Sequence, residues 1–314
     1  MRRVLVLALA FLFLAVPGSV LAHGADVPAP ELPGVLLEWT FDPLALLGLV
    51  LTAAAYVWAV RRVNVAHPAN RQPAYRSWLF MGGLAAIGVA LLSPIEAYEG
   101  ALFSVHMVQH MLLELVAAPL LLAGAPITLA LRVARPSARR RLLSVLQSRI
   151  VHVLSFPVIA WVLFAAVNWG WHFSALYDNA LENVALHYLQ HASFLGAALL
   201  FWWPVVGADP SRWRLPHPVR LLYLFLAMPQ NSFLGVALMS ASTVLYPHYV
   251  TNARDWGLSP LDDQGLGGVI MWVVGDVAFL AGMMIVVLLW MRHEDRRTVR
   301  LDRRLAAERA SQRE

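Results

Sequence analysis

Long apolar runs separated by short polar loops make up most of this chain. Seven runs approach or exceed the length of about 20 residues that an α-helix needs to span a bilayer core. The pattern therefore predicts an all-α fold, a polytopic membrane bundle of seven transmembrane helices. The approximate bounds of the expected helices are residues 43–60, 77–92, 101–131, 153–171, 184–206, 219–240 and 267–291.

The loops between these runs alternate in charge. Arginine gathers after the first, third and fifth runs and again after residue 291, whereas the intervening loops carry mainly Asp and Glu. Because positively charged loops stay in the cytoplasm, we expect the amino terminus outside and the carboxyl terminus inside. Residues 43–291 then form the transmembrane domain, and residues 292–314 form a basic cytoplasmic tail.

The first 22 residues have the features of a secretory signal peptide. Arg2 and Arg3 precede an apolar stretch that ends in the small-residue sequence Val20-Leu21-Ala22. Cleavage there would leave an extracytoplasmic segment, residues 23–42, that begins with His23, and an uncleaved first helix is the alternative. A free amino-terminal histidine can chelate copper, although in this Pro-rich stretch we favour a terminus without that role.

Composition supports the membrane class and narrows the chemistry. Hydrophobic residues make up 59% of the 314 residues and charged residues 14%, against about 25% charged residues in soluble domains. The net charge of +5 is explained by the loop arginines, so no nucleic-acid partner is expected. The chain has no cysteine, which excludes disulfides and thiolate sites. Any metal must bind to His, Met, carboxylate or backbone groups.

One short phrase, H-x-x-Q-H, occurs twice, at His106–His110 and at His187–His191. Residues three and four apart share one face of a helix, so each copy presents two imidazoles and an amide together. Both copies begin runs that pass inward, and His172 ends a run that passes outward, which places all five rings near the outer face. Neutral imidazole binds copper, zinc, iron and nickel. These five histidines are therefore candidate metal ligands, and an interfacial position at a helix end is the alternative for His172.

Other polar and sulfur side chains accompany the phrases. Gln109 and Gln190 belong to them, Glu114 lies one turn beyond the first, and Asp276 lies within the last run. These four residues are expected either to orient the imidazoles through their other ring nitrogen and begin a polar path, or to join helices by hydrogen bonds. Two methionines flank the first histidine pair, and thioether favours Cu(I). Methionine is also an ordinary core residue, and packing in the core is the alternative role for both Met107 and Met111.

Further short motifs accompany the two phrases along the runs. The full set is His106-Met-Val-Gln-His110, Ala118-Pro119-Leu120-Leu121, Gly124-Ala-Pro126, Trp171-His172, Leu176-Tyr177, His187 and His191 with Trp202-Trp203, Asn231 with Leu234-Gly235, Asp263-Gln264, Gly267-Gly268 and Met271-Trp272. By these motifs the sequence resembles the multi-span cytochrome c oxidase assembly factors of the CtaG type. The resemblance extends from the second run to the seventh and leaves about the first 35 residues uncovered.

The resemblance implies a multi-pass protein of the bacterial plasma (inner) membrane that helps to build a haem-copper oxidase for the respiratory chain. The implied partners are oxidase subunits, other assembly or copper-carrier proteins, and membrane lipids. Our leading hypothesis is an assembly factor that accepts copper on the outer histidines and hands it over. A haem-binding membrane protein and a copper transporter are the alternatives. An enzyme is not expected, because no nucleophile–base phrase, phosphate loop or dinucleotide fingerprint appears.

Overall fold

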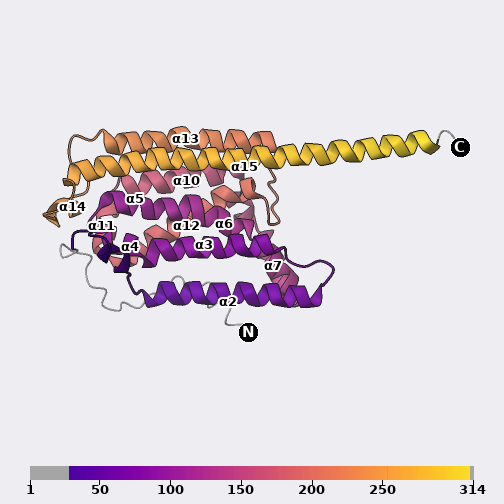
Figure 1. Ribbon diagram of the computed structural model, residues 1–314, viewed down its shortest axis with the longest axis horizontal. Helices are drawn as coiled ribbons and strands as arrows, with labels where there is room; N and C mark the ends of the chain where they lie inside the picture. Colours follow the sequence, from indigo (N-terminus) through magenta and orange to yellow (C-terminus); the bar gives the residue numbers. More distant parts are fainter. Residues whose placement is uncertain (1–27, 253, 312–314) are drawn as a thin grey trace.

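The structure, a computed structural model, describes residues 28–252 and 254–311, and these fold into helices with no β-strand among them. The expected signal peptide and His23 lie outside the described residues. Figure 1 shows long helices stacked side by side along one axis. The prediction of an all-helical fold is therefore confirmed for the described part of the chain.

Six helical stretches among the described residues are long and apolar enough to cross a membrane. A seventh span exists if α10 (Pro157–His172) and α11 (Leu176–Glu182), which meet at 68°, are counted as one broken span. The number seven and the orientation of the termini remain predictions. The six stretches are α2 (Pro43–Ala66), α3 (Ala74–Leu92) with α4 (Pro94–Tyr98), Phe103–Val133, α12 (Val184–Val206), α13 (His217–Met239) and α15 (Pro260–Ser311).

The third stretch, Phe103–Val133, is not one regular helix. The first part, α5 (Phe103–Met111), continues into a π-helix, η2 (Leu112–Ala117), a form that appears mostly as single turns and frequently at functional sites. Two α-helices follow, α6 (Ala118–Ala123) and α7 (Pro126–Val133). Ala125 between them has a left-handed backbone, with φ of 53°, so the apolar run predicted from the sequence contains an interruption before its end.

The two carboxyl-terminal long helices, α13 and α15, form a closely packed antiparallel pair (Figure 1). Two glycines allow the close approach: a Cβ added at Gly235 would lie 2.6 Å from the carbonyl oxygen of Gly268, and the converse contact is equally short. Small residues at such contacts let membrane helices pack by van der Waals attraction. Phe201, Trp202 and Phe279 fill the adjoining core between α12 and this pair.

Helix α15 extends well beyond the bundle and continues into the segment after residue 291 that the sequence predicted as a basic tail (Figure 1). Its extension contains no Gly or Pro after Gly282 and is rich in the strong helix formers Arg, Leu, Ala and Glu. Side-chain contacts one turn apart also support it, including Arg297 with Glu294 at 3.7 Å. Nothing in this segment therefore terminates the helix at the end of the apolar run.

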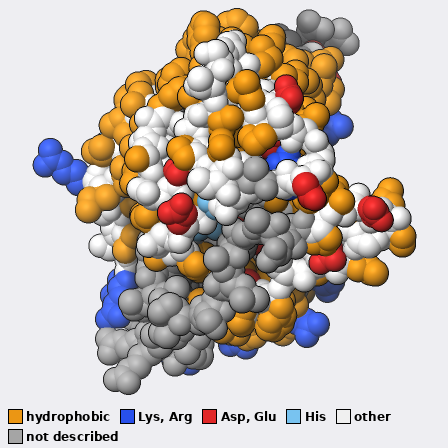
Figure 2. Space-filling model, turned by 90° about the vertical axis from the view of Figure 1, so that its left-hand side faces the viewer, with side chains coloured by type: hydrophobic (Ala, Val, Ile, Leu, Met, Phe, Trp, Pro, Cys, Tyr) orange, Lys and Arg blue, Asp and Glu red, His pale blue; other side chains and the backbone are white. Residues whose placement is uncertain are grey.

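Shorter helices cap the two ends of the bundle. The helices α4, α11 and α14 (His248–Thr251) gather at one end, which is also where α5 and α12 begin (Figure 1). Figure 2 looks onto this end: acidic side chains surround its centre, where a small area of histidine is visible. The remaining short elements are η1 (Gly34–Leu37), α8 (Pro136–Leu146) and α9 (Arg149–Leu154).

Candidate metal centre

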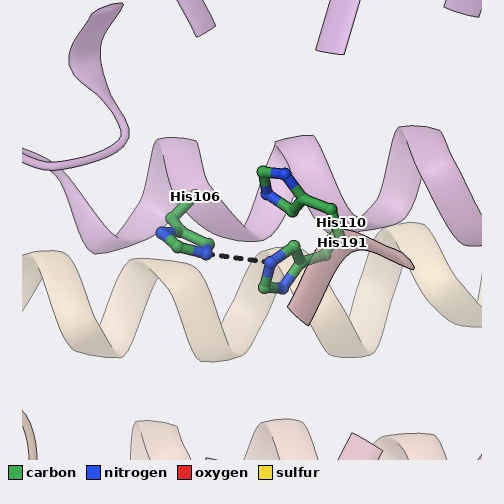
Figure 3. A group of neighbouring side chains, drawn as sticks. All are labelled: His106, His110 and His191. Atoms are coloured by element: carbon green, nitrogen blue, oxygen red, sulfur yellow. Dashed lines mark hydrogen bonds between the residues drawn. The ribbon is translucent and has the colours of Figure 1, made fainter. Parts of the chain in front are cut away.

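The two copies of the repeated phrase face each other across the contact between α5 and α12. The ring centroids of His106 and His187 are 5.6 Å apart, and those of His110 and His191 are 5.8 Å apart. Within each helix the paired rings are closer still, at 4.3 Å and 4.2 Å. Figure 3 shows His191 from α12 reaching towards His106 and His110 of α5. The structure therefore brings the four imidazoles together in one layer.

Both helices are held at their first turns, so the histidines start from fixed positions. The Asn183 side chain caps α12 by accepting hydrogen bonds from the backbone N–H groups of Ala185 and Leu186. Helix α5 is capped from a distant segment, because Asp263 of α15 accepts hydrogen bonds from Phe103 N–H at 2.7 Å and Ser104 Oγ at 2.5 Å. Capping satisfies donors that a helix start otherwise leaves unpaired.

His172 joins the group from the end of α10. Its ring centroid lies 6.3 Å from that of His110, and its Nε2 atom lies 3.4 Å from the sulfur of Met107. Its Nδ1 atom lies 2.7 Å from the carbonyl oxygen of Asn168, which fixes the ring and leaves Nε2 facing the group. We call the five residues the histidine cluster: His106, His110, His172, His187 and His191.

A carboxylate that the sequence analysis treated only as loop charge belongs to this site. Glu99 Oε2 lies 2.6 Å from His106 Nδ1 and 3.8 Å from His187 Nε2. The Glu99 side chain is buried beside both rings. Its position seven residues before His106 was the available signal, but the second phrase has Ala180 at that spacing. The repeat therefore did not point to it.

Two overlapping sets of three ligand atoms meet the geometric requirement for holding a metal ion. The atoms of His106, His110 and His191 lie within 4.8 Å of one another, and so do those of Glu99, His106 and His187. Around one ion, metal–nitrogen bonds of about 2 Å place ligand atoms roughly 3–4 Å apart, so small side-chain rotations suffice. His110 Nδ1 is buried and has no hydrogen-bond partner among the described residues, which fits a ring available for coordination.

Gln109 and Glu114, two of the predicted supporting residues, do connect to the histidines. Gln109 Oε1 lies 3.0 Å from His191 Nε2, while its amide nitrogen donates to the Ala90 carbonyl at 2.9 Å and to Glu96 at 2.5 Å. Glu114 accepts a hydrogen bond from Asn168 Nδ2 at 3.0 Å. Because Asn168 also contacts His172, Glu114 is joined to the cluster through one residue.

The other predicted residues are placed differently. The Gln190 amide is buried, and neither its oxygen nor its nitrogen has a hydrogen-bond partner among the described residues. Asp276 accepts a hydrogen bond from Ser232 Oγ at 2.9 Å, at the contact between α13 and α15. Met107 contacts His172, as noted, whereas Met111 packs in the apolar core. A polar path from the cluster towards Asp276 is therefore not continuous in the described contacts.

The cluster is almost closed. His106 is 0% exposed and His110 1%, whereas His187 and His191 are each 7% exposed. The rings on α12 are thus the more accessible ones.

Comparison with known proteins gives the chain a family. The family model described as cytochrome c oxidase caa3 assembly factor matches residues 54–293. Uncharacterised proteins of Mycobacterium tuberculosis and Mycobacterium bovis are each 35% identical over 289 residues, and one of Mycobacterium leprae is 30% identical over the same length. The alignments cover 89% of this chain but only 43–44% of those relatives, so the chain spans less than half their length. No solved structure matches.

Proposed function

The chain belongs to the family of cytochrome c oxidase caa3 assembly factors, and from this premise we propose that it binds copper on the histidine cluster and hands it to an oxidase subunit. The observation that supports the proposal best is the meeting of five imidazoles and the Glu99 carboxylate at one end of the bundle. Copper is then cargo that the protein binds and releases to the subunit. This transfer requires ligand exchange rather than catalysis.

The ligand types favour copper as this cargo. Imidazole suits both copper oxidation states, and thioether selects Cu(I) over harder ions. The cluster offers both, because the sulfur of Met107 lies beside His172 Nε2. Transfer also requires a site that a partner can reach, and the small exposed areas of His187 and His191 provide that access.

The charge distribution supports an outer location for the cluster. The segment between α2 and α3 and the helix α7, both accompanied by arginines, lie at the opposite end of the bundle (Figure 1). Positively charged loops stay in the cytoplasm. The histidine end then faces the outside of the bacterial plasma membrane, where a copper carrier or the oxidase can meet it.

Haem binding and copper transport have less support. A haem held by two histidines needs the macrocycle between the two rings, yet the rings of the cluster pack on one another and on aromatic neighbours. His110 and Phe194 have centroids 4.3 Å apart, and His106 and Tyr177 5.1 Å apart. A transporter would need polar groups across the whole membrane, and Asp276 contacts Ser232 rather than the cluster.

Complementation of cells that lack this protein tests the proposal. The test variant replaces the four histidines of the repeated phrase with Ala: His106, His110, His187 and His191. We expect it to restore little assembled oxidase at limiting copper, measured by the oxidase absorption spectrum and activity in membranes. The matched control replaces His217 and His293, whose rings lie 5.6 Å apart away from the cluster, and should restore wild-type levels. Full restoration by the four-histidine variant would refute copper delivery by the cluster.

A further inference from the structure

We propose that the cluster offers copper two adjacent positions that share His106 and are occupied one at a time. The outer position consists of Glu99, His106 and His187, and the inner position of His106, His110 and His191. This inference rests on the proposed function, since it takes copper as the cargo. It adds Glu99 as a ligand and assigns an order in which an entering ion meets the residues.

His106 faces the two positions with different nitrogen atoms. Its Nδ1 atom lies 2.6 Å from Glu99 Oε2, and its Nε2 atom lies 2.8 Å from His110 Nε2. The two nitrogens occupy different sides of one imidazole ring. His106 can therefore serve as a ligand at either position, through Nδ1 at the outer one and through Nε2 at the inner one. Transfer between the positions breaks the bond to Nδ1 and forms the bond to Nε2.

The positions are stacked along the helices rather than side by side. His110 and His191 each follow the paired histidine by four residues, on helices that both begin at the histidine end of the bundle. Four residues of α-helix advance about 6 Å, so the inner position lies about one helical turn deeper. Glu99, which comes from the segment between α4 and α5, supplements the outer position alone.

Charge makes the two positions alternatives. Two cations about one imidazole apart repel each other strongly in a buried site, and Glu99 supplies one carboxylate to the pair. A buried charge that is not neutralised is costly. One ion therefore occupies either the outer or the inner position, and entry of a second ion is disfavoured.

The ligands also become softer with depth. The outer position contains one carboxylate oxygen and two imidazoles, whereas the inner position contains three imidazoles. A thioether is also at hand in the cluster, because the Met107 sulfur lies 3.4 Å from His172 Nε2. Oxygen ligands suit harder ions, whereas imidazole and thioether suit copper, the thioether particularly Cu(I). This gradient favours movement of copper inward from the outer position.

Counting the coordinated imidazoles tests the inference directly. The full chain, purified in detergent, receives one equivalent of Cu(II), and pulsed electron paramagnetic resonance counts the imidazole ligands. Glu99→Gln should hold copper with three imidazoles, at the inner position. His110→Ala should hold it with two imidazoles and an oxygen ligand, at the outer position. His106→Ala, which damages both positions, should lower copper affinity at least 100-fold.

The wild-type chain should bind one ion and give a mixture of the two spectra. Glu182→Gln, the same change at an exposed carboxylate, is the matched control and should match the wild type. His187→Ala removes the outer position from the α12 side without altering Glu99, and should give the same spectrum as Glu99→Gln. This second variant keeps the test valid if Glu99→Gln does not fold.

Two results would overturn the shared-position arrangement while leaving the proposed function intact. In the first, His110→Ala binds no copper, while Glu99→Gln and His187→Ala both give the wild-type spectrum. Copper would then have a single site, the inner one. The other is two bound ions per wild-type chain, which would contradict alternate occupancy. A wild-type chain that binds no copper would instead refute the proposed copper delivery, and the inference with it.

Discussion

Gln109 and Gln190 occupy the same place in the repeated phrase but have different surroundings. Gln109 connects His191 to the backbone of α3, through hydrogen bonds of 3.0 Å and 2.9 Å. Gln190 is equally buried, yet its amide has no hydrogen-bond partner among the described residues. The two glutamines therefore provide a matched pair for measuring what the hydrogen bond to the histidine contributes.

Replacing Gln109 with Leu should weaken copper binding, because His191 would lose the group that orients its ring. Loss of such a supporting hydrogen bond typically reduces metal affinity about 10–100-fold. Gln190→Leu is the control and should change the affinity by less than about threefold, since removal of an unpaired buried amide leaves no ligand without support. Competition with a copper chelator measures both affinities. Equal weakening by the two variants would contradict the role of Gln109.

For single residues, the sequence predicted the positions of the histidine rings better than the residues that contact those rings. Spacing and topology placed His106, His110, His187 and His191 in one layer, because helical periodicity alone determines which side chains share a face. Glu99 was missed because its side chain follows the short helix α4, and its direction depends on how that segment folds back on α5. Gln190 was expected to support a histidine by analogy with Gln109, but contacts to neighbouring helices differ between the two copies.

Among the elements, α5 depends on a residue 160 positions away in the chain. Asp263 of α15 caps α5 through Phe103 and Ser104, and Arg254 lies 3.9 Å from the same carboxylate while donating to the Ala101 carbonyl at 2.7 Å. This contact fixes the start of α5 immediately before His106. The position of the first phrase is thus set by the first turn of α15 and by Arg254 in the loop before it, as well as by its own helix.

Asp263→Ala should therefore destabilise the protein by about 1–2 kcal/mol, the usual effect of losing a helix cap, and should also weaken copper binding. The neighbouring Asp262 is exposed; its carboxylate accepts a hydrogen bond from Ser259 Oγ, and its backbone N–H donates to the same hydroxyl. Asp262→Ala leaves the cap of α5 intact and is the control. Thermal unfolding in detergent measures the stability. Unchanged stability for Asp263→Ala would show that the cap contributes little.

A second test at this scale concerns the contact between α13 and α15. Gly235→Ala should destabilise the bundle by about 1–3 kcal/mol, the cost of overpacking, because the new methyl group would meet the Gly268 carbonyl at 2.6 Å. Gly196→Ala in α12 is the control: nothing lies within 4 Å of the added atom, and alanine in a helix interior should stabilise by about 0.5–1 kcal/mol. Opposite shifts in unfolding temperature are expected, and a stable Gly235→Ala would contradict the close packing.

Apolar periodicity predicted the positions of the long helices but not their irregularities. The π-helical turn at Leu112–Ala117 and the left-handed Ala125 lie inside a continuous apolar run, where packing against neighbours rather than local propensity decides the backbone. The sequence likewise predicted a loop after the run that ends at residue 171. The structure has the short helix α11 there, which meets α10 at 68°. After residue 291 local propensity is decisive instead, since α15 continues past the end of the apolar run.

For the whole molecule, the two ends differ in chemistry and are expected on opposite sides of the membrane. Because the chain has no cysteine, single introduced cysteines report orientation cleanly. Glu182→Cys, exposed at the histidine end, should react with a membrane-impermeant maleimide in intact cells. Ser137→Cys, exposed on α8, should react only after the membrane is opened. The reverse labelling pattern would place the cluster in the cytoplasm and exclude delivery from outside.

Copper content of the purified chain tests the central claim most directly. Wild-type protein and the two His→Ala variants described above are loaded with copper, freed of excess ion, and measured by elemental analysis against protein concentration. The wild type and the His217/His293 variant should retain stoichiometric copper, whereas the variant lacking the four phrase histidines should retain almost none. Stoichiometric copper in the four-histidine variant would contradict the assignment of copper to this cluster.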